Sequence, residues 1–346
     1  MKEPEEERRN KSLSHRSCLW YKRAGEDVLC HLCPHSCRIS PGGVGRCLVR
    51  KNDPYHGFVS LNDGQAAAIA VDPMEKKPLY HFHPGTRILS LGTWGCNMGC
   101  FFCQNWPLAT GAPSVELVPI EPPDVEQILQ RHSLRSVAFT YNEPSVWYEF
   151  VLRCARYLKE RGYFVVLVTN GMMCPAPLRT LLPYIDAANV DVKAFSEEHY
   201  TFLGGNLKTV LSFVETLFSG GVHVELTHLL VPGFNDSEEE FKSLLRWVAG
   251  LSPSIPLHVS RSFPQHRWPG PSPSLEQMQS REKLAKSHLF YVYLGNVAAR
   301  TTTICRHCGH DILTRECYNI KLMELDALGK CRFCGGSNFF RLPGSV

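Results

Sequence analysis

The sequence predicts an α/β fold built on a partial barrel of about six parallel β/α units, a (β/α)6-type TIM-like barrel. Two observations predict the barrel. Short β-rich runs recur between residues 87 and 297, and amphipathic helical patterns separate them. A third observation, two Cys-x-x-Cys pairs about twenty residues apart near the end of the chain, predicts a zinc ribbon after the barrel.

Seven runs are strand candidates, and the clearest helical patterns between them cover residues 147–160 and 238–248. Six or seven units are fewer than a complete eightfold barrel has, so we expect an incomplete barrel with its active site at the carboxyl ends of the strands. The candidates are RILSLG (87–92), SVAFTY (136–141), FVVLVTN (164–170), AANVDVKA (187–194), HVELTHLLVP (223–232), LHVSRSF (257–263) and FYVYLGNV (290–297).

We expect three regions. Residues 1–86 form a cysteine-rich segment with a connector and a hairpin, the latter predicted by the Asn62-Asp63-Gly64 turn between two strand-like runs. Residues 87–299 form the barrel, and residues 300–346 form the ribbon module. We expect Zn²⁺ in the ribbon, bound by Cys305, Cys308, Cys331 and Cys334.

Composition places the chain among globular proteins. Hydrophobic residues make up 44% of its 346 residues and charged residues 20%, and the formal charge of +4 does not indicate a nucleic-acid partner. The charged amino terminus lacks the apolar core of a signal peptide, and no apolar run approaches the roughly 20 residues that span a bilayer. We therefore expect a cytoplasmic protein without a membrane partner, whose 15 cysteines are metal ligands rather than disulfides.

Eleven of the fifteen cysteines fall into three tight groups, of which the ribbon is one. The first group lies in a Pro- and Gly-rich loop and suits structural zinc or an auxiliary iron-sulfur cluster, because thiolates bind both. Loose buried thiols are the remaining alternative for it. This group, called the knuckle below, consists of Cys30, Cys33, Cys37 and Cys47.

The third group is WGCNMGCFFCQN, residues 94–105, which carries Cys96, Cys100 and Cys103 after the first barrel strand. Structural zinc needs four protein ligands and a disulfide framework needs an even number of cysteines, so three cysteines suit neither by themselves. A 4Fe-4S cluster held by three cysteines keeps one iron open for another ligand. The alternative is a zinc site that a histidine or cysteine elsewhere completes.

A Cys-x-x-x-Cys-x-x-Cys loop after the first strand of a β/α barrel, with Phe102 before the last cysteine, resembles the radical S-adenosylmethionine (radical SAM) superfamily. The resemblance implies that the amino and carboxylate groups of S-adenosylmethionine bind the open iron of a 4Fe-4S cluster. It also implies that the reduced cluster cleaves this cofactor to methionine and a 5'-deoxyadenosyl radical, which takes hydrogen from a substrate.

Motifs at later strand ends extend the resemblance to the pyruvate formate-lyase activating enzyme group. TYNEP (140–144) stands where that superfamily has Gly-Gly-Glu-Pro, so Glu143 is expected to contact the cofactor's amino group, with Asn142 replacing a glycine beside it. VTNG (168–171), with Asn170, and DVK, with Asp191 and Lys193, match motifs that hold the cofactor. The activating enzymes carry an arginine where this chain has Thr227.

Overall, the chain most resembles the radical enzyme of the AmmeMemoRadiSam group. The resemblance rests on CPHSCRI, GVGRC, DPMEKKPLYHFHPG, GTWGCNMGCFFCQNW, TYNEP, VPGFND, SRSFP and YLGNV. It implies an association with Memo-like and AMMECR-type proteins, and the superfamily implies reduced flavodoxin or ferredoxin as electron donor. The substrate stays open.

We therefore expect a radical SAM enzyme. A glycyl-radical activating enzyme is the first alternative, and a non-catalytic zinc-ribbon binding protein is the second. Simpler roles are also open for single residues: a helix cap or ion pair for Glu143, a salt bridge between Asp191 and Lys193, and core packing or surface pairing rather than a substrate contact for His258 and Arg261. Cys18, Cys154, Cys174 and Cys317 are expected to fill space, and of these Cys174 is the one candidate for a reactive thiol.

Overall fold

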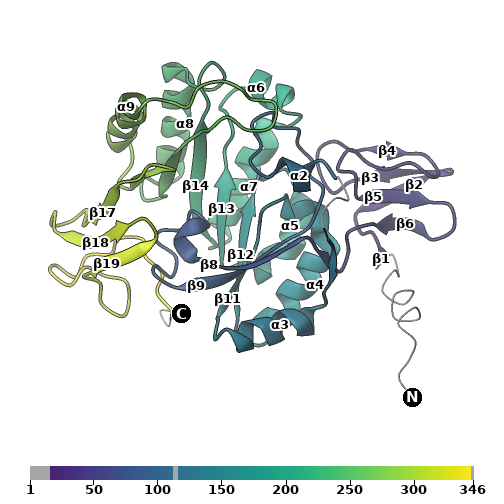
Figure 1. Cartoon of the computed structure of the whole chain (residues 1–346), viewed down its shortest axis with the longest axis horizontal. Helices are drawn as coiled ribbons and strands as arrows, with labels where there is room; N and C mark the ends of the chain where they lie inside the picture. Colours follow the sequence, from purple (N-terminus) through teal and green to yellow (C-terminus); the bar gives the residue numbers. More distant parts are fainter. Residues whose placement is uncertain (1–15, 112–115, 344–346) are drawn as a thin grey trace.

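The protein is built around one open eight-stranded sheet (Figure 1), seen in a computed structural model that describes residues 16–111 and 116–343. Seven strands are parallel and follow one another in chain order, whereas the edge strand β8 is antiparallel to its neighbour. Sequential parallel order is the arrangement of a barrel rather than of a doubly wound sheet. From one edge to the other the strands are β8 (Ala68–Pro73), β9 (Arg87–Gly92), β11 (Ser136–Phe139), β12 (Phe164–Thr169), β13 (Ala187–Asp191), β14 (His223–Leu230), β15 (Leu257–Arg261) and β16 (Val292–Gly295).

Helices cover the outer face of this sheet and connect its strands. Several begin at side-chain caps: Ser237 accepts the Glu240 amide at the start of α8, and Ser274 forms a capping box with Gln277 at the start of α9. The α-helices are α2 (Trp106–Ala109), α3 (Pro122–Arg131), α4 (Tyr148–Lys159), α5 (Pro175–Leu181), α6 (Glu197–Phe202), α7 (Leu207–Ser219), α8 (Glu238–Leu251) and α9 (Leu275–Lys286). The 3-10 helices are η1 (Met74–Lys76), η2 (Pro144–Trp147) and η3 (Leu182–Tyr184).

The two faces of the sheet differ in chemistry because side chains alternate along a strand. On β14, Val224 and Leu226 belong to the main apolar core together with Leu244 of α8. Their neighbours His223 and Glu225 are also buried but lie on the inner face. The outer face therefore holds the helices, and the inner face encloses polar groups.

A buried carboxylate organises the inner face. Glu225 accepts hydrogen bonds from His223 Nε2 at 3.1 Å and His258 Nε2 at 2.7 Å, and from the backbone amides of Tyr80 at 2.9 Å and His81 at 2.7 Å. Burial raises its pKa, but the donated hydrogen bonds lower the pKa well below its usual value. This network fastens the connector between β8 and β9 inside the barrel.

The amino-terminal region forms small antiparallel sheets beside the barrel, and the predicted hairpin at residues 62–64 is wrong. The turn is present, but β6 pairs with β5 and β1, whereas β7 pairs with β10 and β8 pairs with β9. Turn chemistry fixes a local reversal, and burial against distant strands decides the pairing. The strands are β1 (Arg16–Ser17), β2 (Tyr21–Ala24), β3 (Asp27–Cys30), β4 (Arg38–Ile39), β5 (Arg50–Asp53), β6 (Gly57–Ser60), β7 (Gln65–Ala66) and β10 (Val118–Pro119).

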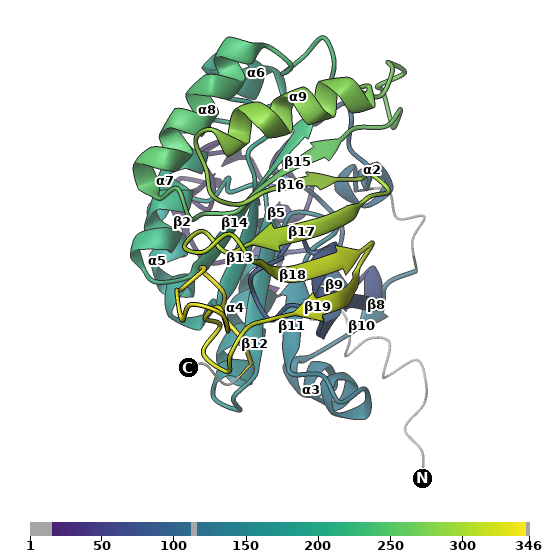
Figure 2. The same ribbon diagram turned by 90° about the vertical axis from the view of Figure 1, so that its left-hand side faces the viewer.

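The carboxyl-terminal ribbon is a three-stranded antiparallel meander of β17 (Arg300–Ile304), β18 (Asp311–Glu316) and β19 (Asn319–Met323), which faces the viewer in Figure 2. It covers the barrel where strands begin, since Arg341 Nη2 donates to the carbonyl of Gly221 at 2.6 Å, just before β14. In Figure 1 the ribbon and the small amino-terminal sheets lie on opposite sides of the barrel.

The charged residues 1–15 lie outside the described residues. Within the described ranges, no helix has the length and apolar character needed to cross a bilayer.

We predict that His81 makes the folded protein sensitive to acid. Burial, opposed by Glu225, lowers the pKa of His81 to about 3, whereas in the unfolded chain it is about 6.5. Below pH ~6.5 the unfolded chain therefore takes up a proton that the folded protein does not, so the free energy of unfolding falls by about 1.4 kcal/mol per pH unit. Urea unfolding between about pH 7 and 5 should show a shallower decline for His81→Asn.

His132→Asn, at an exposed histidine, is the matched control and should keep the wild-type slope. Equal slopes for His81→Asn and the wild type would contradict this role for His81.

Candidate active site

The three predicted cysteines lie in the loop that follows β9, at the carboxyl end of the sheet. Cys96, Cys100 and Cys103 are free thiols of intermediate exposure. The loop curls tightly, with the Cys103 amide donating to the Cys100 carbonyl at 3.2 Å. The structure therefore brings the triplet to the end of the barrel where active sites form.

The TYNEP motif clamps both ends of the cysteine loop. Asn142 accepts the Thr93 amide through Oδ1 at 3.0 Å and donates through Nδ2 to the Gly95 carbonyl at 3.0 Å. Asn105 Nδ2 donates to the carbonyl of Tyr141 at 2.8 Å, and Tyr141 adopts a positive φ of 73°. Asn142, expected at the cofactor, is thus engaged with the loop backbone.

Asn170 links the end of β12 to the first cysteine. Its Nδ2 lies 2.9 Å from Asn97 Oδ1 and 3.8 Å from Cys96 Sγ, so it donates to both. Asn97 Nδ2 donates to the Met172 carbonyl at 2.8 Å. An amide donor at Cys96 favours the thiolate that a metal requires. No sequence motif pointed to Asn97, apart from its place next to Cys96.

Glu143 is buried beside Cys96, and its charge helps to raise the pKa of that thiol, after burial. Its Oε1 accepts the Ser145 amide at 2.9 Å and the Thr169 hydroxyl at 2.7 Å, and its Oε2 accepts the Asn170 amide at 2.7 Å. The carboxylate therefore caps η2, the simpler role left open above. Because each carboxylate oxygen has about two acceptor positions, Oε2 has room for a further donor.

Asp191 and Lys193 form an ion pair at the end of β13, with Lys193 Nζ 2.6 Å from Asp191 Oδ2. The two side chains face the same side, as their alternation predicts. Burial lowers the pKa of Lys193, but Asp191 and Cys100 outweigh it and raise the pKa above its usual value. In return, burial raises the pKa of Cys100 to about 11 while Lys193 lowers it, and Lys193 acts likewise on Cys103. A lysine charge thus compensates two thiolates of the triplet.

Aromatic rings border the loop. Phe102 is buried, and Phe101 packs edge-on against it at 4.9 Å between ring centroids. Phe101 also contacts Phe234 at 5.2 Å, Phe202 at 5.6 Å and Trp268 at 5.6 Å. We call these five residues the aromatic wall. The sequence signalled only Phe102, and the other rings come from loops whose convergence the fold alone determines.

Three other residues discussed above have partners outside the triplet. His258 is paired with Glu225 in the barrel interior, which is the core role left open above. Arg261 donates from Nε to the Pro273 carbonyl at 2.7 Å, fixing the loop before α9. Thr227 donates through Oγ1 to Asn189 Oδ1 at 3.0 Å.

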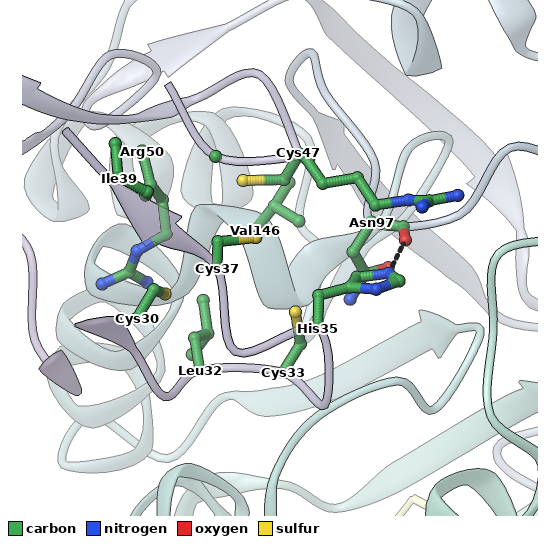
Figure 3. A pocket seen from close by; sticks show the side chains of 12 residues that line it. Cys30, Leu32, Cys33, His35, Cys37, Ile39, Cys47, Arg50, Asn97 and Val146 are labelled. Atoms are coloured by element: carbon green, nitrogen blue, oxygen red, sulfur yellow. Dashed lines mark hydrogen bonds between the residues drawn. The ribbon is translucent and has the colours of Figure 1, made fainter. Parts of the chain in front are cut away.

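The knuckle cysteines line one cavity beside the cysteine loop (Figure 3). His35 Nε2 lies 2.6 Å from the carbonyl oxygen of Asn97, which joins the two loops. Cys174 borders the knuckle, since its amide donates to the Leu32 carbonyl at 2.9 Å. The sulfurs of Cys33, Cys37 and Cys47 turn toward the middle of the cavity.

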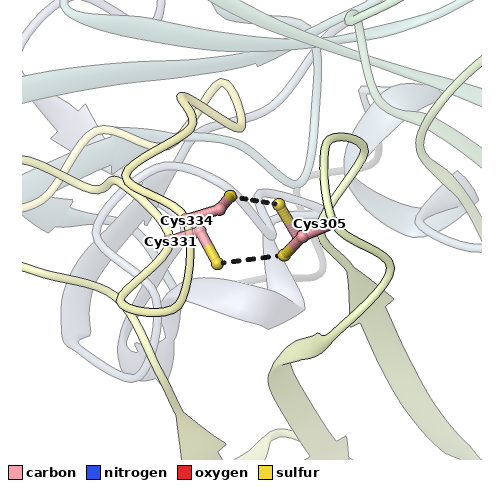
Figure 4. Close-up of side chains that lie close together, drawn as sticks. Cys305, Cys331 and Cys334 are labelled. Carbon is pink, nitrogen blue, oxygen red and sulfur yellow. Dashed lines mark hydrogen bonds between the residues drawn. The ribbon is translucent and has the colours of Figure 1, made fainter.

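The ribbon cysteines form a compact four-sulfur group (Figure 4). Their ligand atoms all lie within 4.8 Å of one another, with Cys305 Sγ 3.7 Å from Cys334 Sγ and Cys308 Sγ 3.7 Å from Cys331 Sγ. Burial raises the pKa of Cys305, but donors that include Asn338 Nδ2 at 3.3 Å lower it to about 6. Four close thiols, one of them stabilised as a thiolate, fit tetrahedral Zn²⁺. The ribbon covers the amino ends of the strands, so it does not border the triplet.

The geometry fits an iron-sulfur enzyme: the loop supplies three thiols, a lysine charge compensates two of them, and an amide donates to the third. Comparison with known proteins agrees. The model of the radical SAM superfamily matches residues 91–248. An uncharacterized protein of Methanocaldococcus jannaschii is 33% identical over 329 residues, covering 92% of this chain and 98% of that one.

Two further comparisons agree. The pyruvate formate-lyase 1-activating enzyme of Escherichia coli strain K12 is 25% identical over 197 residues, covering 54% of this chain and 78% of that enzyme. A radical SAM methyltransferase from Sphaerobacter thermophilus shares the fold, with a TM-score of 0.50 and 16% identity over 69% of this chain and 72% of the other.

The chain belongs to the radical SAM superfamily and is an enzyme of the radical SAM class, similar to pyruvate formate-lyase activating enzymes. The superfamily implies a 4Fe-4S cluster and S-adenosylmethionine, together with a reductant such as flavodoxin or ferredoxin. Membership in this class of enzymes excludes the alternative of a non-catalytic zinc-ribbon binding protein.

We predict that Gly95→Ala loosens the cysteine loop from the knuckle. A Cβ on Gly95 would lie 2.6 Å from Val49 Cγ1 and 2.7 Å from the Cys47 carbonyl oxygen, at a φ of +90°. The free energy of unfolding should fall by about 1–3 kcal/mol, measured by denaturant unfolding. Gly25→Ala is the matched control, because Gly25 has a φ of +66° with nothing within 4 Å. An equal loss of unfolding free energy in both variants would show that backbone strain, and not the clash with the knuckle, causes the effect.

Asn338→Ala should weaken zinc binding by the ribbon about 10- to 100-fold, because it removes a hydrogen bond to the Cys305 sulfur. Chelator competition measures the affinity. The matched control is Asn319→Ala, at an exposed position on β19. Wild-type affinity in Asn338→Ala would contradict the role assigned to Asn338.

Proposed function

We propose that this enzyme uses a 4Fe-4S cluster on Cys96, Cys100 and Cys103 to cleave S-adenosylmethionine and abstract hydrogen from a substrate. One observation carries the proposal: the cysteine triplet stands at the carboxyl end of the barrel with Lys193 beside two of its thiols and Glu143 beside the third. When bound, the cluster and cofactor supply a 5'-deoxyadenosyl radical.

Glu143, Asp191 and Lys193, at the strand ends, would each bind a different polar group of the cofactor. Glu143 Oε2 would accept a hydrogen bond from the amino group, because the Asn170 amide occupies only one of its acceptor positions. Lys193 would pair with the carboxylate, and Asp191, about a third exposed, would accept hydrogen bonds from other polar groups of the cofactor. Asn142 and Asn170 hold the loop so that these contacts converge.

The aromatic wall contributes by excluding water. A radical that abstracts hydrogen must meet the intended C–H bond before any other, and a dry, rigid pocket achieves this. Phe234 and Trp268 each pack against Phe101 of the cysteine loop. Their position supports a substrate entrance next to them.

Reduced flavodoxin or ferredoxin is the proposed electron donor, and Memo-like and AMMECR-type proteins are the first partners in which to seek a substrate. The cysteine-rich sites, which need reduced thiols, favour the cytoplasm.

A second candidate is a glycyl-radical activating enzyme. The similarity to the Escherichia coli enzyme of that name favours it. Thr227 disfavours it, because the activating enzymes carry an arginine there and Thr227 is engaged with Asn189. In this case the substrate would be a backbone glycine of a partner protein, and incubation with that partner would yield a stable protein radical.

We predict that the anaerobically reconstituted and reduced protein forms 5'-deoxyadenosine from S-adenosylmethionine. A variant with Cys96→Ala, Cys100→Ala and Cys103→Ala should form none, since it lacks the cluster ligands. Glu143→Gln should raise the KM for S-adenosylmethionine about 10-fold, because it loses one charge-assisted hydrogen bond. Product quantified by chromatography is the measurement.

Cys317→Ala, which removes an exposed thiol outside the three groups, is the matched control and should keep wild-type activity. Absence of product from fully loaded wild type, with several reductants, would contradict the proposed function.

A further inference from the structure

The knuckle presents a built cavity that the proposed reaction does not use. All four of its cysteines line one cavity, together with the apolar side chains of Leu32, Ile39 and Val146. None of the four thiols is in a disulfide. The four thiols therefore share one cavity, where a single metal centre can reach all of them.

The spacing of the sulfurs separates the knuckle from the ribbon. Zinc with Zn–S bonds near 2.3 Å requires four sulfurs about 3.8 Å apart. Across residues 16–111 and 116–343, only the ribbon cysteines form a group of three or more ligand atoms that all lie within 4.8 Å. The knuckle cysteines do not form a group of this kind. A 4Fe-4S cluster places each thiolate on a different iron and so needs wider spacing.

Arg50 gives an independent indication of a sulfur-rich ligand. It lines the same cavity and is 1% exposed. Its Nη2 contacts Glu149 Oε1 at 3.1 Å, yet Nε and Nη1 are buried with no hydrogen-bond partner among the described residues. Buried guanidinium groups without acceptors are costly. The sulfides and thiolates of a cluster would supply acceptors and negative charge, because hydrogen bonds to cluster sulfurs are a common feature of such sites.

The knuckle also adjoins the proposed active site. Asn97 borders the cavity and directly follows Cys96 in the chain. Its carbonyl contacts His35 of the knuckle, while its side chain contacts Asn170 and Met172 at the strand ends. Asn97 thus lies between the knuckle and the cysteine triplet. The ribbon, by contrast, lies on the opposite side of the barrel (Figure 1).

We propose that Cys30, Cys33, Cys37 and Cys47 bind a second iron-sulfur cluster of the 4Fe-4S type, rather than zinc. All four irons have protein ligands, so this cluster has no open position for S-adenosylmethionine. The chain then carries two clusters side by side and one zinc on the far side of the barrel.

Metal content after anaerobic reconstitution with iron and sulfide tests the proposal. The wild type should hold ~8 irons, a similar amount of sulfide and ~1 zinc per chain. The variant with Cys96→Ala, Cys100→Ala and Cys103→Ala should retain ~4 irons with sulfide, and after reduction give an electron paramagnetic resonance signal that S-adenosylmethionine does not change. Cys317→Ala should match the wild type.

A wild type with ~4 irons and ~2 zincs, or a triple variant without iron, would overturn the proposal. The count on the unmodified chain decides the question even where a variant fails to fold. A complementary variant, Cys30→Ser with Cys33→Ser, should lose ~4 irons and keep its zinc, and loss of zinc instead would also contradict the assignment. The iron and zinc contents do not depend on 5'-deoxyadenosine formation. The experiment can therefore contradict the second cluster without contradicting the proposed function, and the reverse also holds.

Discussion

The hydrogen bonds that fix the cysteine loop are the constraint on which the rest of the site depends. A loop with three thiols has no defined ligand geometry by itself, because its backbone has no sheet partner after β9. Asn142 holds its start through Thr93 and Gly95, and Asn170 holds its middle through Asn97 and Cys96. Parallel strand order places β11 next to β9 and β12 on the other side of β11, and the two asparagines follow the carboxyl ends of these strands. The fold therefore positions the loop.

The same architecture closes the opposite end of the barrel. Glu225 binds the connector amides, and the ribbon inserts Arg315, which is fully buried 3.5 Å from Glu75. Buried charges are tolerated only when paired and hydrogen-bonded, so this end has a fixed structure. The polar interior thus serves stability, and the chemistry is left to the carboxyl ends of the strands.

Much of the fold followed from the sequence because its signals were local. The β-rich run at residues 87–92 matches β9 at both ends. The runs that begin at residues 164 and 187 located β12 and β13 at their first residues but ran too far, since Asn170 and Lys193 leave the sheet to enter the site. The predicted hairpin at residues 62–64 was wrong, because the strands on either side of the turn pair with other strands instead of with each other. Glu225 could not be assigned, since its amide donors at Tyr80 and His81 are more than 140 residues away in sequence. The cysteine triplet was recognisable because its spacing is itself the signal, whereas Asn97 and Trp268 act only through contacts that folding creates.

The central claim is that three protein thiolates leave one iron for S-adenosylmethionine. Electron-nuclear double resonance of the reduced protein, with cofactor isotopically labelled in its amino nitrogen and carboxylate oxygens, tests it most directly. The account predicts hyperfine coupling of both labels to a paramagnetic cluster, which disappears when Cys96, Cys100 and Cys103 are replaced. Bound cofactor without coupling at a fully loaded cluster would contradict it.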